Sequence, residues 1–163
     1  MDPALITDWG DFAVAMAGAA AALAGLVMVA ISVNVREILA LPGVPARAAA
    51  AVGSLVLIVV TAGLLLVPGQ AAPVLGAELI VAVAPVIALH TVSLRHRARH
   101  SSTPKFTLAV YIPLAAVQMI PFLLGGLLLM AGGGGLYLIA AGILLTVVGS
   151  MLEAWVLMVE ILR

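Results

Sequence analysis

Hydrophobic residues along the chain fall into five long runs, which short polar, glycine-containing or proline-containing segments separate. The runs cover residues 12–35, 48–67, 74–94, 106–130 and 136–162. Each run has about 20 residues or more, the length that an α-helix needs to cross the hydrocarbon core of a bilayer. The pattern therefore predicts about five transmembrane helices.

Composition agrees with this interpretation. Of the 163 residues, 65% are hydrophobic and 9% are charged, whereas a soluble domain has about 25% charged residues. The runs are continuous and lack the alternation of a membrane β-barrel. In lipid, such segments satisfy their backbone hydrogen bonds as helices. We expect an all-α fold, an integral membrane helical bundle that forms one domain over residues 1–163.

The positions of the basic residues predict an orientation. With five spans, every Lys and Arg falls on the same side of the membrane, namely Arg36, Arg47, Arg95, Arg97, Arg99, Lys105 and Arg163. The opposite side holds Asp2, Asp8, Asp11 and Glu78. Because basic loops stay in the cytoplasm, we expect the N-terminus outside and the C-terminus inside, in the cell (plasma) membrane.

Small residues recur at helical spacing in the first and last runs. Gly18, Ala22 and Gly25 lie on one face of the first run, and Gly142 and Gly149 lie on one face of the last. Small residues allow membrane helices to approach closely. Both faces are therefore expected to be helix-packing stripes, either within the fold or within an oligomer.

Polar residues inside the apolar runs are candidates for function. Glu153 is the clearest, since an acidic group in a membrane helix is costly and is by default a functional hypothesis. In one interpretation, Glu153 pairs with Arg36 or Arg95 and locks helices together. In the other, Glu153, Thr146 and Gln118 form an intramembrane polar site that handles protons or cations.

The basic stretch between the third and fourth runs is expected to contact anionic lipid headgroups. Its cationic side chains are Arg95, Arg97, Arg99 and Lys105. His96 and His100 have the spacing of two metal ligands on a helix, but the arginines around them would repel a cation. The net charge is zero and cysteine is absent. We therefore predict no metal site, no cofactor and no nucleic-acid partner.

Sequence motifs of enzymes are missing. The chain has no nucleophile elbow, no metalloprotease motif, no P-loop and no dinucleotide fingerprint. Its three aspartates, Asp2, Asp8 and Asp11, all precede the first run, so they form no intramembrane aspartyl pair. The chain is predicted not to be an enzyme.

Two segments at the ends of the chain resemble a known family. The stretch Trp9–Asn34 and the closing stretch Ala154–Arg163, with Ser32, Trp155 and Glu160 among the matching positions, are similar to small multi-pass proteins from actinobacteria-type genomes. That family is sometimes labelled a modulator of the FtsH protease. The resemblance implies a regulatory membrane protein that acts through contacts with a membrane-anchored AAA protease.

Two functions remain open. The first is a non-enzymatic regulator, accessory subunit or structural component of a membrane complex. The alternative is a homo-oligomeric channel, or a small-solute or ion pathway, that uses Glu153, Thr146 and Gln118. In both cases the expected partners are the lipid bilayer and either further copies of the chain or a larger membrane complex.

Overall fold

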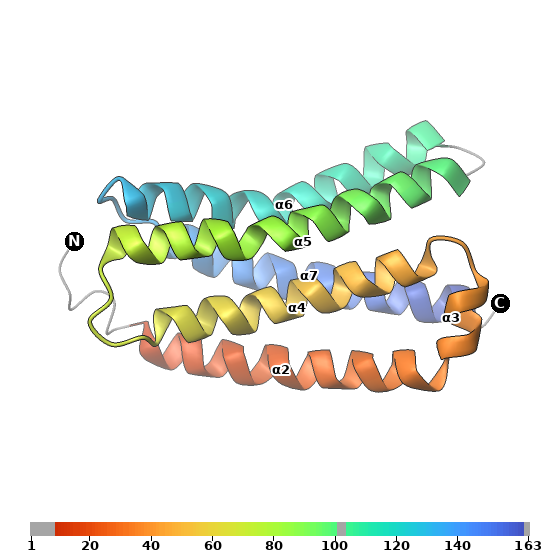
Figure 1. Cartoon of the computed structure of the whole chain (residues 1–163), viewed down its shortest axis with the longest axis horizontal. Coiled ribbons are helices and arrows are strands. Elements are labelled where there is room, and N and C mark those ends of the chain that lie inside the picture. The colour runs from red at the N-terminus through yellow and green to blue at the C-terminus, as the bar shows by residue number, and fades with distance from the viewer. Residues whose placement is uncertain (1–8, 101–103, 162–163) are drawn as a thin grey trace.

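The computed structural model describes residues 9–100 and 104–161, which form a bundle of antiparallel helices (Figure 1). The helices are α2 (Gly10–Val33), α3 (Val35–Ala40), α4 (Val44–Leu65), α5 (Ala72–His100), α6 (Pro104–Met130) and α7 (Leu136–Ile161). Five of them, all except α3, are long and apolar enough to cross a membrane. No strand occurs in these ranges, so the predicted all-α bundle of about five transmembrane helices is confirmed.

Charged residues divide the bundle into two distinct ends. One end carries the C-terminal ends of α2, α5 and α7 and the N-terminal ends of α4 and α6, together with α3 (Figure 1). We call it the basic end, because its cationic residues are Arg36, Arg47, Arg95, Arg97, Arg99 and Lys105. Asp11 and Glu78 lie near the opposite end.

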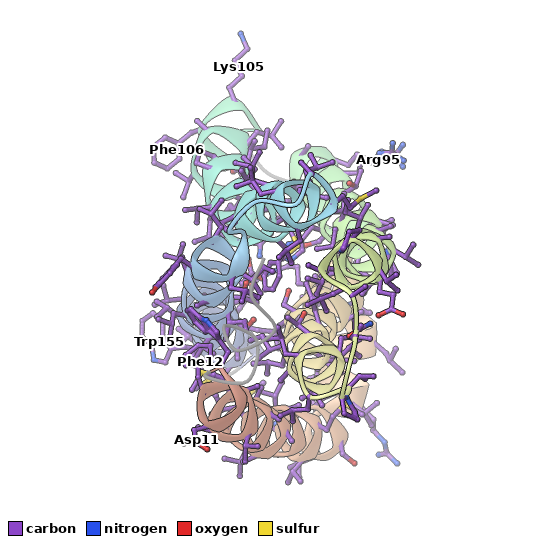
Figure 2. The ribbon with its side chains drawn as sticks, turned by 90° about the vertical axis from the view of Figure 1, so that its left-hand side faces the viewer. Asp11, Phe12, Arg95, Lys105, Phe106 and Trp155 are labelled. Carbon is purple, nitrogen blue, oxygen red and sulfur yellow. The ribbon has the colours of Figure 1, made fainter. Side chains whose placement is uncertain are left out.

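The helices are not equivalent in cross-section. Helices α4 and α7 contact each other in the middle, α5 and α6 pair on one side, and α2 packs chiefly against α4 on the other (Figure 2). In the most apolar 18-residue window of each helix, 56% of α4 is buried inside the bundle but only 6% of α2. Helix α4 is therefore central, and α2 is a peripheral helix with most of its surface free.

Glycines set the closest helix contacts away from the basic end. A Cβ atom on Gly76 of α5 would lie 2.4 Å from the carbonyl oxygen of Gly126 in α6. A Cβ atom on Gly135 would lie 2.1 Å from the carbonyl oxygen of Gly125. Backbones approach this closely in membranes only where small residues permit it. Large side chains such as Phe122 and Leu55 are fully buried in the core.

Two helix boundaries at the start of the chain differ from the predicted spans. The first long helix ends at Val33, where the side-chain amide of Asn34 donates to the carbonyl oxygen of Ala30 at 2.9 Å. The short helix α3 follows, which the hydrophobic pattern did not predict. Helix α4 begins at Val44 rather than residue 48, because Gly43 adopts a left-handed φ of 84° and proline is favourable in a first helical turn.

The third long helix also extends beyond the predicted span of about residues 74–94. Helix α5 continues past residue 94 to His100, so the part of the charged stretch from Arg95 to His100 is helical rather than a loop. Hydrophobicity marks where a helix leaves the hydrocarbon core, whereas arginine and alanine favour helix in water as well. The consequence is that Arg95, Arg97 and Arg99 have fixed positions on a helix.

Candidate functional site: a charged cavity at the basic end

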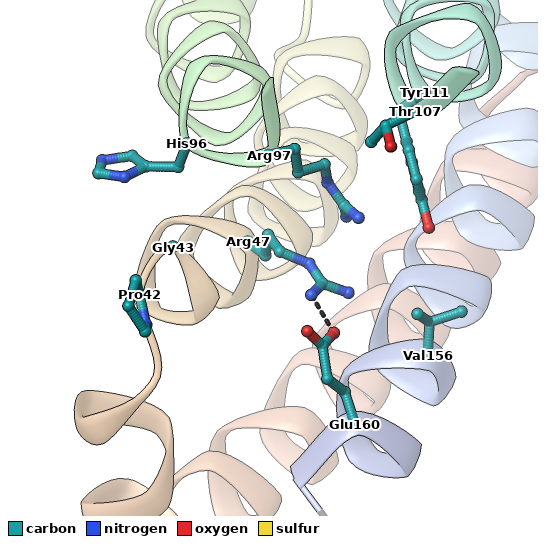
Figure 3. A pocket seen from close by; sticks show the side chains of 9 residues that line it. All are labelled: Pro42, Gly43, Arg47, His96, Arg97, Thr107, Tyr111, Val156 and Glu160. Atoms are coloured by element: carbon teal, nitrogen blue, oxygen red, sulfur yellow. Dashed lines mark hydrogen bonds and ion pairs between the residues drawn. The ribbon is translucent and has the colours of Figure 1, made fainter. Parts of the chain in front are cut away.

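A cavity of about 300 Å³ lies at the basic end, between the α3–α4 turn and helices α4, α5, α6 and α7. Its lining residues are Pro42, Gly43, Arg47, His96, Arg97, Thr107, Tyr111, Val156 and Glu160 (Figure 3). Four helices thus contribute polar or charged side chains to one partly open cavity. The lining residues come from parts of the chain that are far apart in sequence, from Pro42 to Glu160.

Arg97 and Glu153 form a buried ion pair beside this cavity. The Nη2 group of Arg97 donates to both carboxylate oxygens of Glu153, at 2.9 and 2.8 Å. The two side chains are 8% and 9% exposed. The guanidinium carbon of Arg97 also lies 3.7 Å from the centroid of the Tyr111 ring, a cation–π contact.

This geometry corrects two expectations. The partner of Glu153 is Arg97, and neither Arg36 nor Arg95 is bonded to it. Arg97 was expected to contact anionic lipid, but its guanidinium is buried in the pair and is not a surface cation. A buried carboxylate that is held by a guanidinium connects α5 to α7, as the interpretation of Glu153 as a helix lock requires.

A second ion pair joins Arg47 on α4 to Glu160 on α7, through Nη1 of the arginine. The Arg47 side chain is 7% exposed, whereas that of Glu160 is 48% exposed. The Nε and Nη2 atoms of Arg47 are buried and have no hydrogen-bond partner among the residues that the structure describes. Glu160 therefore accepts from only one of the three nitrogen atoms of Arg47, and the other two are left without an acceptor.

Sequence reasoning missed Arg47 and Tyr111 as members of a site. It used Arg47 only to set the orientation, and it gave Tyr111 no role. One signal was available, since Arg47 is followed directly by the apolar segment Ala48–Val52, which places it on a helix rather than in a loop. No pattern in the sequence pairs it with Glu160.

The predicted intramembrane polar site is divided in the structure. Gln118 and Thr146 do meet, because the Thr146 hydroxyl donates to the Gln118 carbonyl oxygen at 3.4 Å. The Gln118 amide nitrogen donates to the carbonyl oxygen of Leu114 at 3.0 Å. Glu153 lies about 10 Å further along α7, seven residues beyond Thr146, and belongs to the charged cluster with Arg97.

Buried polar atoms remain near Gln118. Its Oε1 atom and the hydroxyl of Ser150 have no hydrogen-bond partner within the described ranges. Both side chains are inside the protomer, as is Thr146. These groups therefore do not line an outer surface where the axis of a symmetric oligomer would pass.

A further polar contact joins α4 and α5. The hydroxyl of Ser54 and the Nε2 atom of His90 lie 2.9 Å apart, and both side chains are buried. Among the described residues, no group of three or more His, Cys, Asp or Glu side chains could hold a metal ion. The contact is thus a hydrogen bond between helices.

The two small-residue stripes lie in different environments. A Cβ atom on Gly142 would lie 3.0 Å from the Phe122 ring, and one on Gly149 would lie 2.4 Å from the Gln118 side chain. The stripe of the last helix therefore packs against α6.

The stripe of the first helix has no such neighbour. Gly18, Ala22 and Gly25 are all exposed, and a Cβ atom on either glycine would meet nothing within 4 Å. Helix α2 instead packs through the buried Ala13 and Ala20. The expectation that Gly18, Ala22 and Gly25 pack within the fold is therefore wrong, and contact with another chain is the expectation that remains.

The exposed cations of the basic end, among the described residues, are Arg36, Arg95, Arg99 and Lys105. Figure 2 shows Arg95 and Lys105 extending away from the helices. Contact of these side chains with anionic lipid headgroups stays a prediction.

Comparison with known proteins finds no matching family model, no matching curated protein and no matching solved structure.

Proposed function

We propose that this chain is a non-enzymatic membrane protein that acts as a regulator, accessory subunit or structural component of a membrane complex. The observation that carries the proposal is the outward position of Gly18, Ala22 and Gly25 on α2. Small residues on a lipid-facing surface make little apolar contact with lipid, and they allow another helix to approach closely. A peripheral helix with this face is suited to contact a second membrane protein.

The resemblance at the ends of the chain identifies the partner to test first. The similar stretch Trp9–Asn34 includes all of α2 and therefore the outward stripe. A membrane-anchored AAA protease in the cell membrane is the partner that this resemblance implies. Further copies of the chain would use the same surface.

The test is the mass of the intact particle, extracted from native membranes in a mild detergent and measured by native mass spectrometry. We expect the wild-type particle to contain a second polypeptide. Gly18→Leu should release the chain as a monomer, because the added side chain keeps the partner helix at a distance. Gly63→Leu is the matched control, since Gly63 is also exposed with nothing within 4 Å of its Cβ position.

Two results would contradict the proposal. A wild-type chain that leaves the membrane as a monomer has no partner of useful affinity. A Gly18→Leu particle with the wild-type mass would mean that another surface makes the contact.

A second candidate function, a small-solute or ion pathway, is favoured by the unpartnered polar atoms of Gln118 and Ser150 between α6 and α7. Such a pathway would have to run through the protomer, because these side chains are buried inside it. Flux into proteoliposomes that decreases in Gln118→Ala and in Glu153→Gln would support it. Flux equal to that of empty liposomes would exclude it.

A further inference from the structure

Arg47, one of the residues that line the cavity at the basic end, has a buried guanidinium with one unused edge. An arginine side chain has five N–H donors in a planar fork. Nη1 of Arg47 is bonded to Glu160, while Nε and Nη2 are buried without a partner among the described residues. Nε and Nη2 form one edge of the fork, and this edge donates two parallel hydrogen bonds to two oxygens of a carboxylate or phosphate.

The surroundings of this edge favour a negative guest. Arg47, Arg97, Tyr111 and Glu160 reach toward the same space from four different helices (Figure 3). Glu153 is occupied by Arg97 through both of its oxygens. The guanidinium of Arg97 lines the same volume, and guanidinium groups donate hydrogen bonds but accept none, so the cavity offers donors to a guest with acceptor oxygens.

Among the described residues that line the cavity, Glu160 is the only carboxylate. It lies in the last turn of α7, and its side chain is about half exposed. Ion pairs with such an exposed partner are weak because water competes for the carboxylate. A guest anion can share Arg47 with Glu160 or displace it without unpairing the Arg97–Glu153 bridge.

The height of the cavity in the membrane indicates the kind of anion. Helix α5 has 29 residues, a length of roughly 43 Å at about 1.5 Å per residue, which exceeds the hydrocarbon thickness of about 30 Å. Arg97 is near the C-terminal end of α5 and so lies at the level of the headgroups. Phosphate is the anion that lipid headgroups supply there, and basic pockets between membrane helices are known sites for it.

We propose that this cavity binds a phosphate group, and that the Nε–Nη2 edge of Arg47 is its principal ligand. The phosphate belongs either to the headgroup of an anionic lipid or to a free phosphate ester, since the same chemistry recognises both. Arg97, Thr107 and Tyr111 line the same volume. The site is separate from the outward face of α2 on which the proposed function rests.

The experiment uses the purified full chain and two probes. In the first arm, the chain is placed in phosphatidylcholine vesicles with or without phosphatidylglycerol, and the retention of phosphatidylglycerol is measured by native mass spectrometry. In the second arm, inorganic phosphate is titrated against the detergent-solubilised chain and the shift of Tm is recorded. Retention of the lipid identifies a headgroup as the ligand, and a response to phosphate alone identifies a free anion.

Substitutions test the assigned contacts. Arg47→Gln should weaken binding about tenfold or more, as expected for the loss of a bidentate charged contact. Glu160→Gln should strengthen it several-fold, because the competing carboxylate is removed while the shape is kept. Arg36→Gln is the control, since Arg36 is an exposed arginine at the same end, and its affinity should equal that of the wild type.

The proposal is overturned if neither probe binds, or if Arg47→Gln binds as tightly as the wild type. It is also overturned if Glu160→Gln binds no more tightly. If Arg47→Gln fails to fold, Arg47→Lys takes its place: it keeps the charge but lacks the two-donor edge, so its affinity should also fall, and unchanged affinity would overturn the proposal.

Discussion

At the scale of single residues, the Arg97–Glu153 pair is the contact whose loss we expect to matter most for stability. Glu153→Ala leaves a buried guanidinium without its carboxylate. Breaking one partner of such a pair costs on the order of 3 kcal/mol. Unfolding of the variant in mixed detergent micelles should show this loss, whereas Glu37→Ala, at an exposed glutamate of the same end, should change stability by less than about 0.5 kcal/mol.

A double substitution tests whether Arg97 and Glu153 stabilise the fold through their contact with each other. Adding Arg97→Leu to Glu153→Ala removes the stranded charge, so the free energy of unfolding should recover by at least half. If the second substitution instead adds its own full loss, the two residues are not coupled and the assignment of the pair is wrong.

At the scale of helices, α6 and α7 approach each other through Gly149. A Cβ atom there would lie 2.4 Å from the Gln118 side chain. Gly149→Ala should therefore destabilise the bundle by about 1–3 kcal/mol, as thermal unfolding would report. Gln118→Ala in the same chain should restore much of the loss, because the obstructing group is then gone.

Gly63→Ala on α4 is the control for this pair, since its Cβ position is open. An alanine favours helix over glycine, so this variant should be at least as stable as the wild type. A Gly149→Ala variant with wild-type stability would show that α6 and α7 are not in the close contact described.

The five long helices could be predicted because each crosses lipid and so must be apolar along its length. Hydrophobicity did not predict helix α3, the start of α4 or the charged end of α5. These segments lie outside the long apolar runs, where hydrophobicity carries no signal. Glu153 was found because it is an acidic residue well inside an apolar run. The role of Arg47 was not predicted, because its partner Glu160 is 113 residues away in sequence. Only the packing of the helices brings the two residues together.

At the scale of the whole molecule, the orientation in the membrane is a prediction from the basic end. The chain has no cysteine, so single-cysteine variants label cleanly. We expect a membrane-impermeant maleimide to label Asp11→Cys on intact cells, and to label Lys105→Cys only after the cells are permeabilised. The reverse pattern would place the basic end outside.

The surface that would join this molecule to a partner is the outward face of α2. A photoreactive group attached to Ala22→Cys samples what lies against that face in native membranes. The same group on Val81→Cys, at a side chain of α5 that is 73% exposed, samples a lipid-facing control position.

Photo-crosslinking at these two positions is the most direct measurement of the proposed role in a complex. We expect Ala22→Cys to give a discrete adduct that contains a second polypeptide, and Val81→Cys to give lipid adducts alone. Lipid adducts alone at both positions would mean that α2 faces only the bilayer, which would contradict the proposed role in a membrane complex.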